Sequence, residues 1–223
     1  MSVLLLQLSG PFQSWGVQSR FGVRDTGLEP SKSGVAGLLC AALGRPRWAT
    51  LEDLAQLRMG VRADQEGRLL RDYQTAGKGG YLRASGELER DDVILSSRYY
   101  LADACFLVAL EGEDGLLQTL HAALQNPVWP LYLGRKAFPP GRPVWLPDGY
   151  RPGETVLDAL RAYPWLGTDR SRLRDPVRVV IDDPAGAEVR PDGVPASFAA
   201  RVYPLRRVST RYIPAPPLRE EGA

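Results

Sequence analysis

The segment VLLLQLSGP, residues 3–11, opens the element order on which the fold prediction rests. Its short aliphatic run contains one glutamine and is closed by Ser-Gly-Pro, a pattern that predicts a buried first strand. A polar loop follows, and then the segment SKSGVAGLLCAAL, residues 31–43. Its apolar residues recur with the one-face spacing of a helix, and Gly44 and Pro46 mark the end. The chain therefore begins with a strand, a long loop and an amphipathic helix.

The order of the later elements predicts the fold class. Strand-like or helix-like patterns follow at residues 59–63, 69–74, 99–110 and 115–124. Residues 75–97 are glycine-rich, charged and aperiodic, which predicts an exposed hairpin or a mobile loop. This order fits an α+β fold with a ferredoxin-like (RRM-like) βαββαβ core, if residues 131–133 or 144–146 supply the last strand. Sheets of this type bind single-stranded RNA in RRM modules.

The amino-acid composition changes after about residue 149. Proline, glycine and arginine recur every few residues, with short β-like pieces at residues 177–181 and 206–213. We therefore predict a first domain over residues 1–148, a small β-rich C-terminal subdomain over residues 149–213, and a disordered tail over residues 214–223.

Composition indicates an ordinary globular protein. The 223 residues are 44% hydrophobic and can build a core without metal or disulfide support. Cys40 and Cys105 lie in apolar runs without any CxxC pattern, so neither a zinc site nor a disulfide is expected. The first residues lack a basic region, and their apolar stretch is too short for a signal peptide or a membrane span. We expect a cytoplasmic protein without cofactor, metal or membrane contact.

The basic residues are unevenly distributed. The formal net charge is +2, yet segments 1–48, 121–151 and 194–212 carry net charges of +3, +3 and +4. If the fold brings the three segments together, they form a basic groove for a polyanion.

Several motifs within these segments suit nucleic-acid binding, each with a structural alternative. Ser31, Lys32 and Ser33 open the first predicted helix and could seat a phosphate, or serve only as helix caps. Trp15 could stack on a base or plug the end of the sheet. Arg20 and Arg24, in the polar loop, suit phosphate contacts. Aromatic and basic residues alternate in WPLYLGRK, residues 129–136, as stacking beside phosphate pairing requires.

Catalysis has little support in the sequence. No P-loop, GxSxG or HExxH pattern occurs, and the lone histidine, His121, lies within a predicted helix. An endoribonuclease centred on Tyr73, Lys78 or His121 remains the alternative function. A third possibility is a purely protein-binding cap, whose basic segments meet acidic partner surfaces.

Four motifs in order resemble one family. They are GPFQSWG (residues 10–16), PSKSG (30–34), RDYQT (71–75) and YLGRK (132–136), supported by YLADA (100–104). Together they resemble the CasD family of the type I-E CRISPR surveillance complex, Cascade. The likeness runs from residue 3 to about residue 147 and weakens through the C-terminal third.

The resemblance implies a RAMP-superfamily protein that caps the 5′ handle of the guide RNA (crRNA) without cleaving it. It implies an RRM-like core and a β-hairpin thumb, placed at residues 75–97. It also implies contacts with the backbone subunit CasC and the large subunit CasA, and with target DNA only through the assembled complex. The residues expected to bind RNA are Gln13, Trp15, Arg20, Arg24, Ser31, Lys32, Ser33, Tyr73, Gln74, Lys78, Arg83, Arg98, Tyr132, Gly134, Arg135, Lys136 and Arg207.

Overall fold

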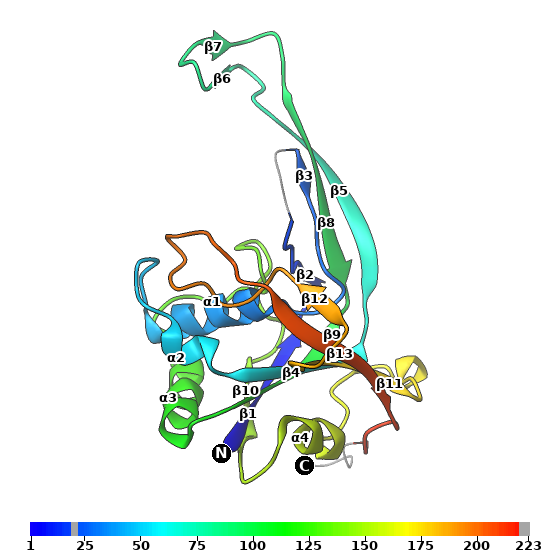
Figure 1. Ribbon diagram of the computed structural model, residues 1–223. Helices are drawn as coiled ribbons and strands as arrows, with labels where there is room; N and C mark the ends of the chain where they lie inside the picture. The colour runs from blue at the N-terminus through cyan, green and yellow to red at the C-terminus, as the bar shows by residue number, and fades with distance from the viewer. Residues whose placement is uncertain (19–21, 219–223) are drawn as a thin grey trace.

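The computed structural model describes residues 1–18 and 22–218, which form a mixed α+β fold with antiparallel sheets (Figure 1). In the described residues the main sheet has seven strands in the order β10-β1-β9-β4-β11-β13-β12. Its bounds are β1 Ser2–Ser9, β4 Arg58–Gln65, β9 Cys105–Gly112, β10 Trp145–Pro152, β11 Val177–Asp182, β12 Glu188–Arg190 and β13 Arg206–Ile213. Every neighbouring pair in this sheet is antiparallel.

Helices cover both faces of the main sheet. On one face α1 (Lys32–Leu43) and α3 (Asp114–Gln125) pack against the even-numbered residues of β1, including Leu4 and Leu6. On the other face α4 (Val156–Ala162) packs against the odd-numbered residues Val3 and Leu5. Because successive side chains of a strand point to opposite faces, a strand covered on both sides reads as a continuous apolar run. This is why residues 3–8 contain almost no polar side chain.

The predicted end signal of α1 is confirmed, whereas Ser31 occupies the N-cap position but its side chain forms no capping hydrogen bond. The helix begins after Ser31 and ends at Gly44, which has a φ of +70° and donates its N–H to Ala41 O. Glycine adopts this left-handed conformation without the steric cost of a Cβ. The predicted helix over residues 115–124 is α3, where the Glu113 carboxylate accepts from the backbone amides of Gly115 and Leu116. The short α2 (Glu52–Ala55) lies between α1 and β4.

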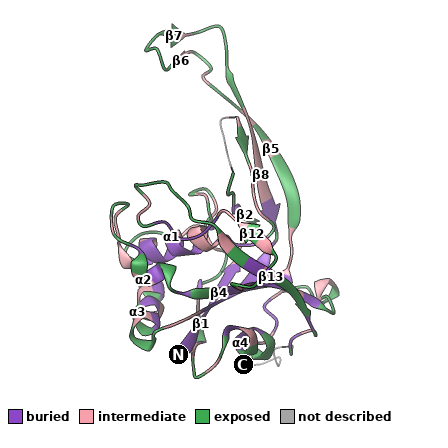
Figure 2. Cartoon of the chain, in the orientation of Figure 1, coloured by how far each residue is buried: buried purple, intermediate pink, exposed green. Residues whose placement is uncertain are grey.

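A long two-stranded arm, which we call the thumb, projects from the main body (Figure 1). Strands β5 (Arg68–Ala76) and β8 (Ile94–Ala102) pair along their whole length, and β6 (Tyr81–Leu82) pairs with β7 (Leu88–Glu89) beyond them. Most side chains of this arm are exposed or half-buried, in contrast to the main sheet (Figure 2). The thumb therefore begins before residue 75 and ends after residue 97, the bounds predicted from the sequence. Residues 69–74, predicted as a core strand, belong to the thumb.

The root of the thumb is a second, four-stranded sheet. Two short strands, β2 (Phe12–Gln13) and β3 (Val23–Arg24), pair with β8 on the edge opposite β5. The run at residues 99–110, predicted as one central strand, is divided between two sheets at Asp103. That residue has a φ of +56° and separates β8 from β9.

The C-terminal third continues the main sheet. Strands β11 and β13 occur where the sequence predicts them, and β11 pairs directly with β4. The predicted boundary at residue 148 falls inside β10, and residues 131–133 form no strand. Residues 214–218 lack regular structure, but Trp165 N donates to Pro217 O at 2.8 Å. Residues 219–223, the rest of the predicted tail, lie outside the described residues.

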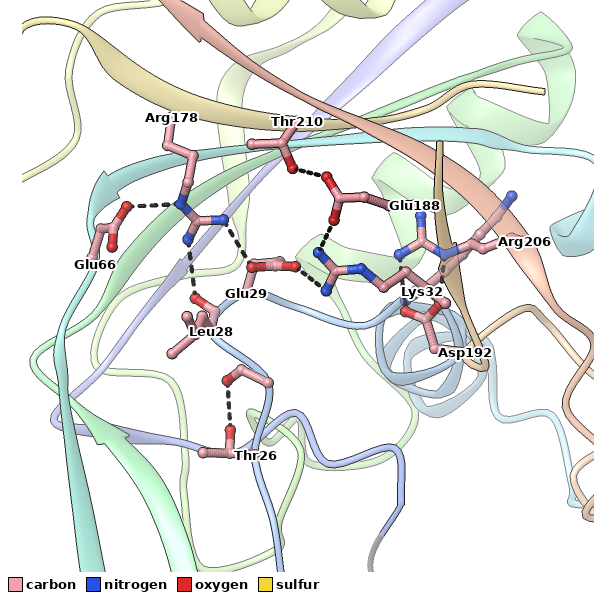
Figure 3. A network of polar contacts seen from close by, with 12 residues as sticks. Thr26, Leu28, Glu29, Lys32, Glu66, Arg178, Glu188, Asp192, Arg206 and Thr210 are labelled. Carbon is pink, nitrogen blue, oxygen red and sulfur yellow. Dashed lines mark hydrogen bonds and ion pairs between the residues drawn. The ribbon is translucent and has the colours of Figure 1, made fainter. Parts of the chain in front are cut away.

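An ion-pair network ties the loop before α1 to this C-terminal part (Figure 3). Glu29 accepts from Arg178 at 2.9 Å and from Arg190 at 2.7 Å. Asp192 accepts from Arg206 at 2.7 Å and from the backbone N–H of Lys32 at 3.0 Å. The network fixes the start of α1 relative to β11, β12 and β13.

Candidate nucleic-acid interface

One face of the thumb root gathers basic and aromatic side chains from three strands. Arg98 and Tyr100 are two residues apart in β8 and therefore point to the same face. Arg24 of β3 is the register partner of Arg98, and Phe12 of β2 is the partner of Ala102 on that same face. Cross-strand partners share a face of the sheet. We call this side of the thumb root the β8 face.

Arg24, Arg98 and Arg135 form a guanidinium cluster at the β8 face. The pKa of Arg135 lies below its ordinary value because the side chain is partly buried and because Arg98 and Arg24 lie close by; Asp25 and Asp72 oppose the shift. Arg135 donates one Nη to Arg24 O at 3.2 Å and to Asp25 O at 3.4 Å. Its charge is therefore held beside two other positive charges by backbone carbonyls.

The cluster lacks the anionic partners that arginines elsewhere in the chain have. Within residues 1–18 and 22–218, none of the three arginines forms an ion pair with a carboxylate. The Nε of Arg98 is buried and has no hydrogen-bond partner in the same residues. Like charges held together disfavour the folded state unless an anion compensates them. This arrangement suits a phosphate group, to which guanidinium donates in a bidentate way.

A cleft of about 560 Å³ lies next to the cluster. It brings together segments that are far apart in the sequence: the loop after β1, the exposed side of α1, the turn at residues 129–135 and the loop at residues 191–203. Seven of the residues expected to bind RNA line it, namely Trp15, Arg24, Ser31, Ser33, Tyr132, Gly134 and Arg135. The predicted convergence of separate segments is present for this group.

Gln13 and Trp15 have structural roles that the binding prediction did not assign to them. Gln13 is fully buried and donates its amide to Leu8 O at 3.0 Å and to Ala104 O at 2.8 Å. Its Oε1 accepts from the Trp15 indole at 3.1 Å, and Trp15 is only 1% exposed. Expecting Gln13 to contact RNA was therefore wrong, because all its polar atoms are used inside the protein. Trp15 is packed in the core, where its ring lies against Gly34 of α1, and it offers no exposed face for stacking.

The start of α1 is already bonded to carboxylates of the protein. Lys32 Nζ lies 2.8 Å from Asp182 Oδ2, and its side chain is 13% exposed. Asp192 accepts from the backbone amides of Lys32 and Ser33, through its carboxylate and its carbonyl respectively. The predicted phosphate seat is therefore filled from within the chain, and Ser31 is buried. Ser31 and Ser33 nevertheless border the cleft, together with one side of this helix.

The predicted thumb residues do not form one group. Gln74 lies on the β8 face and donates to Asp72, whereas Tyr73 points to the opposite face and contacts Arg71. Lys78 is an exposed residue of the distal thumb turn. Arg83, farther out, is ion-paired with Glu89.

The remaining predicted residues are divided between the cleft and other surfaces. Lys136 is exposed beside Arg135 at the cleft turn. Arg207 lies on β13, where it donates to Gly186 O at 3.0 Å, outside the cleft lining. Arg20 falls outside the described residues. The segment 194–212 contributes less charge than expected, because Arg206 and Arg211 are ion-paired with aspartates.

The family model described as CRISPR-associated protein (Cas_Cas5) matches residues 3–209, most of the chain. The chain belongs to the Cas5d/CasD family. The resemblance predicted from four sequence motifs is thereby confirmed.

Individual members of the Cas5d/CasD family support the assignment. The CRISPR system Cascade subunit CasD of Escherichia coli (strain K12) is 35% identical over 159 residues, which cover 65% of this chain and 70% of that protein. A structure described as a crystal structure of a Cas protein is 40% identical, with a TM-score of 0.79 over 97% of this chain and 98% of that one. A chain of a CRISPR RNA-guided surveillance complex is 33% identical, with a TM-score of 0.76 over 96% and 91%.

The structure does not assemble the residues of the alternative endoribonuclease. Tyr73 and Lys78 lie on the thumb, whereas His121 lies in α3 at the other end of the molecule and packs against Trp145 (Figure 1). The described part of the chain contains no group of three or more potential metal ligands. It also contains no helix long and apolar enough to cross a membrane.

The sequence analysis missed residues that line the same surface. Arg45 and Arg47 border the cleft, where Arg45 is bound to Asp53 and Arg47 donates to Phe198 O at 3.2 Å. Phe12, Tyr100 and Phe138 form an aromatic group next to Arg135. Phe12 and Tyr100 belong to the motifs GPFQSWG and YLADA, so part of their signal was present in the segments that carry the family resemblance.

Proposed function

We propose that this chain is an RNA-holding subunit of a CRISPR RNA-guided surveillance complex. In this role it binds the 5′ handle of the guide RNA and takes no part in cleavage. Membership of the Cas5d/CasD family supports the assignment to such a complex, since relatives carry the names Cascade subunit CasD and surveillance complex. The RNA-binding role has separate support from the geometry of the site.

The guanidinium cluster is the observation that carries this proposal. Arg24, Arg98 and Arg135 converge from three segments and form no ion pair with a carboxylate in the described residues, and Arg24 and Arg135 border the cleft. Contacts to phosphates fix the position of a nucleic acid without reading its sequence. RNA running along the β8 face into the cleft would meet Lys136 and Tyr132 at the same turn.

The fold suits this role. The elements β1, α1, β4, β9, α3 and β10 follow the βαββαβ order, and their strands are arranged β10-β1-β9-β4. We propose that they form the ferredoxin-like, RRM-like core, with β11, β12 and β13 as an extension of its sheet. The thumb and its short partner strands then act as a platform beside the core rather than as part of it.

The neighbouring subunits are proposed from the family alone. CasC and CasA would adjoin this chain, and target DNA would reach it only in the assembled complex. The thumb has the exposed apolar side chains that a protein contact would cover, including Leu69 at 54% and Ile94 at 48% exposure. An isolated two-stranded arm is only marginally stable in water, so contact with neighbours would stabilise it.

The experiment is a salt titration of RNA binding with charge-neutralising variants. The full chain is mixed with a short single-stranded RNA, and the Kd is measured between 50 and 200 mM salt. If about five phosphates are engaged, affinity falls roughly 10²-fold over this range, because each phosphate contributes about −0.7 to the logarithmic slope. Replacing Arg24, Arg98 and Arg135 by glutamine should weaken binding and reduce the size of the slope by about 0.7 for each phosphate that they hold.

Arg161→Gln provides the matched control. Arg161 is exposed on α4, away from the cleft, and the change removes the same charge. It should leave both the Kd and the slope close to those of the wild type. A wild-type affinity independent of salt, or equal losses for Arg161 and the cluster, would contradict the proposal. Discrete cleavage products that vanish with His121→Ala would instead support the endoribonuclease.

A further inference from the structure

Three aromatic side chains meet at the root of the thumb and remain partly open to solvent. The rings of Phe12 and Tyr100 pack edge to face, with centroids 4.9 Å apart and planes at 82°. The Phe138 ring lies 5.8 Å from each of them. Phe12 is 41% exposed, in contrast to the core phenylalanine Phe106, which is completely buried. The group is therefore an aromatic surface and not part of the enclosed core.

The aromatic surface adjoins the guanidinium cluster on the same face of the sheet. Tyr100 follows Arg98 by two residues in β8, a separation of about 7 Å along a strand. Arg135 connects the two groups directly. Its Cζ lies 5.7 Å from the Phe138 ring centroid, and its guanidinium donates to Arg24 O. A phosphate on the arginines would place the attached nucleoside within reach of Tyr100 and Phe12.

We propose that Phe12 and Tyr100 form a stacking platform for one unpaired base, whose neighbouring phosphate is held by Arg24, Arg98 and Arg135. This inference rests on the proposed function, because it concerns the same RNA. Single-stranded nucleic acid is the occupant that the charges favour, since an anionic backbone matches three neighbouring arginines that form no ion pair with a carboxylate in the described residues. Aromatic rings beside such a cluster are the combination that binds single strands.

The platform would favour single-stranded over double-stranded RNA and would not discriminate between base sequences. Every base has a π face, so stacking tolerates all four bases. Phe12 and Phe138 have no hydrogen-bonding group in their side chains, and Tyr100 has only one hydroxyl. A base paired in a duplex is stacked on its neighbours and cannot enter the platform. The site should therefore prefer an unpaired nucleotide at one position of the bound RNA.

The test combines protein variants with abasic RNA in the full chain. Phe12→Leu and Tyr100→Leu keep apolar volume but remove the ring. Each should weaken binding of a short single-stranded RNA by about 5- to 150-fold, the range expected for one stacked base. Abasic sites are then scanned along the RNA. An abasic site at one position should weaken binding to the wild-type protein by the same factor. It should cause little further loss of affinity with Phe12→Leu, because the abasic site and the substitution remove the same contact.

Tyr212→Leu is the matched control, since Tyr212 is 65% exposed on β13, outside the cleft lining. It should bind RNA as the wild type does. Ultraviolet crosslinking of the wild-type chain to RNA containing 4-thiouridine provides a readout independent of variant folding, with adducts expected on Phe12 or Tyr100.

The outcomes separate the inference from the function on which it rests. If Arg98→Gln weakens binding while Phe12→Leu and Tyr100→Leu do not, the platform is wrong and the phosphate site stands. Adducts confined to the opposite face would also overturn the platform. If the wild-type chain binds no RNA, the proposed function itself fails.

Discussion

Replacing Arg62 by methionine should strongly destabilise the fold, because it removes the positive half of a fully buried ion pair. Arg62 in β4 has no exposed surface and binds Asp64 through two hydrogen bonds of 2.5 and 2.9 Å. It also donates to the carbonyls of Leu160, Tyr163 and Pro164, which end α4. The substitution would leave the Asp64 carboxylate and these carbonyls without their donor.

The expected loss follows from the burial of the pair. Removing one partner of a buried ion pair costs about 3–5 kcal/mol, because the remaining charge is uncompensated. At this chain length each kcal/mol lowers the Tm by roughly 2–4 °C, so a fall of about 6–20 °C is expected. Burial raises the pKa of Asp64, and the guanidinium of Arg62 opposes that rise. Without Arg62 the carboxyl should take up a proton.

Urea unfolding at pH 7 and pH 5 is the assay. A carboxyl whose pKa is raised in the folded state contributes stability that is present at low pH and lost as pH rises through that pKa. The deficit of Arg62→Met should therefore be smaller at pH 5 than at pH 7. Arg161→Met, on the exposed side of α4, is the control and should change stability by about 0.5 kcal/mol or less. An Arg62→Met protein within about 1 kcal/mol of the wild type at pH 7 would refute this reasoning.

Three further predictions concern the turn at the cleft, the thiols and the start of α1. Gly134→Ala should destabilise the protein by about 1–3 kcal/mol in thermal unfolding, because φ is +87° and a Cβ would collide with Ser14 O. Burial raises the pKa of Cys40 to about 11 and that of Cys105 to about 12. The free energy of unfolding should therefore fall as pH rises from 9 toward 11, by up to about 1.4 kcal/mol per pH unit for each thiol. A variant with both cysteines replaced by alanine should lack this part of the decline. Asp192→Ala should cost about 2–5 kcal/mol, because it removes an acceptor of the α1 amides and also a partner of the largely buried Arg206. It should speed hydrogen exchange in the first turn of α1, and unchanged exchange would show that Asp192 does not cap this helix.

Elements with a strong local pattern could be predicted from the sequence. The helices α1 and α3 have apolar residues on one face, and β1 has apolar residues on both faces because both are covered. The short helix α4 was missed among prolines and glycines. Its signal was Thr155, whose hydroxyl accepts from the backbone N–H of Asp158 in the manner of a helix cap.

The assignment of strands to sheets could not be predicted. The run at residues 99–110 has high β propensity throughout, but propensity does not tell which sheet a strand joins. The left-handed backbone at Asp103 separates its two halves, one in the thumb and one in the core. For the same reason residues 69–74 appeared to be a core strand, although their side chains are largely exposed.

The candidate site could be predicted only in part, because whether a side chain is free to bind RNA depends on residues far from it in the sequence. Lys32 has the sequence context of a phosphate ligand, but its ammonium group is bound by Asp182, 150 residues later in the chain. The sequence suggests that Gln13 is exposed, but its side-chain amide donates to the distant carbonyl of Ala104. Arg24 and Arg135 were recognised as candidates, but strand register brings Arg24 to Arg98, and hydrogen bonds to the carbonyls of Arg24 and Asp25 bring Arg135 beside them.

A structure of the full chain bound to guide RNA, alone or within its complex, is the most direct test of the RNA-holding role. We expect phosphate oxygens about 2.7–3.0 Å from the guanidinium groups of Arg24, Arg98 and Arg135, the distance of charge-assisted hydrogen bonds. RNA density on another surface, with these three arginines facing solvent or a neighbouring protein, would contradict the account.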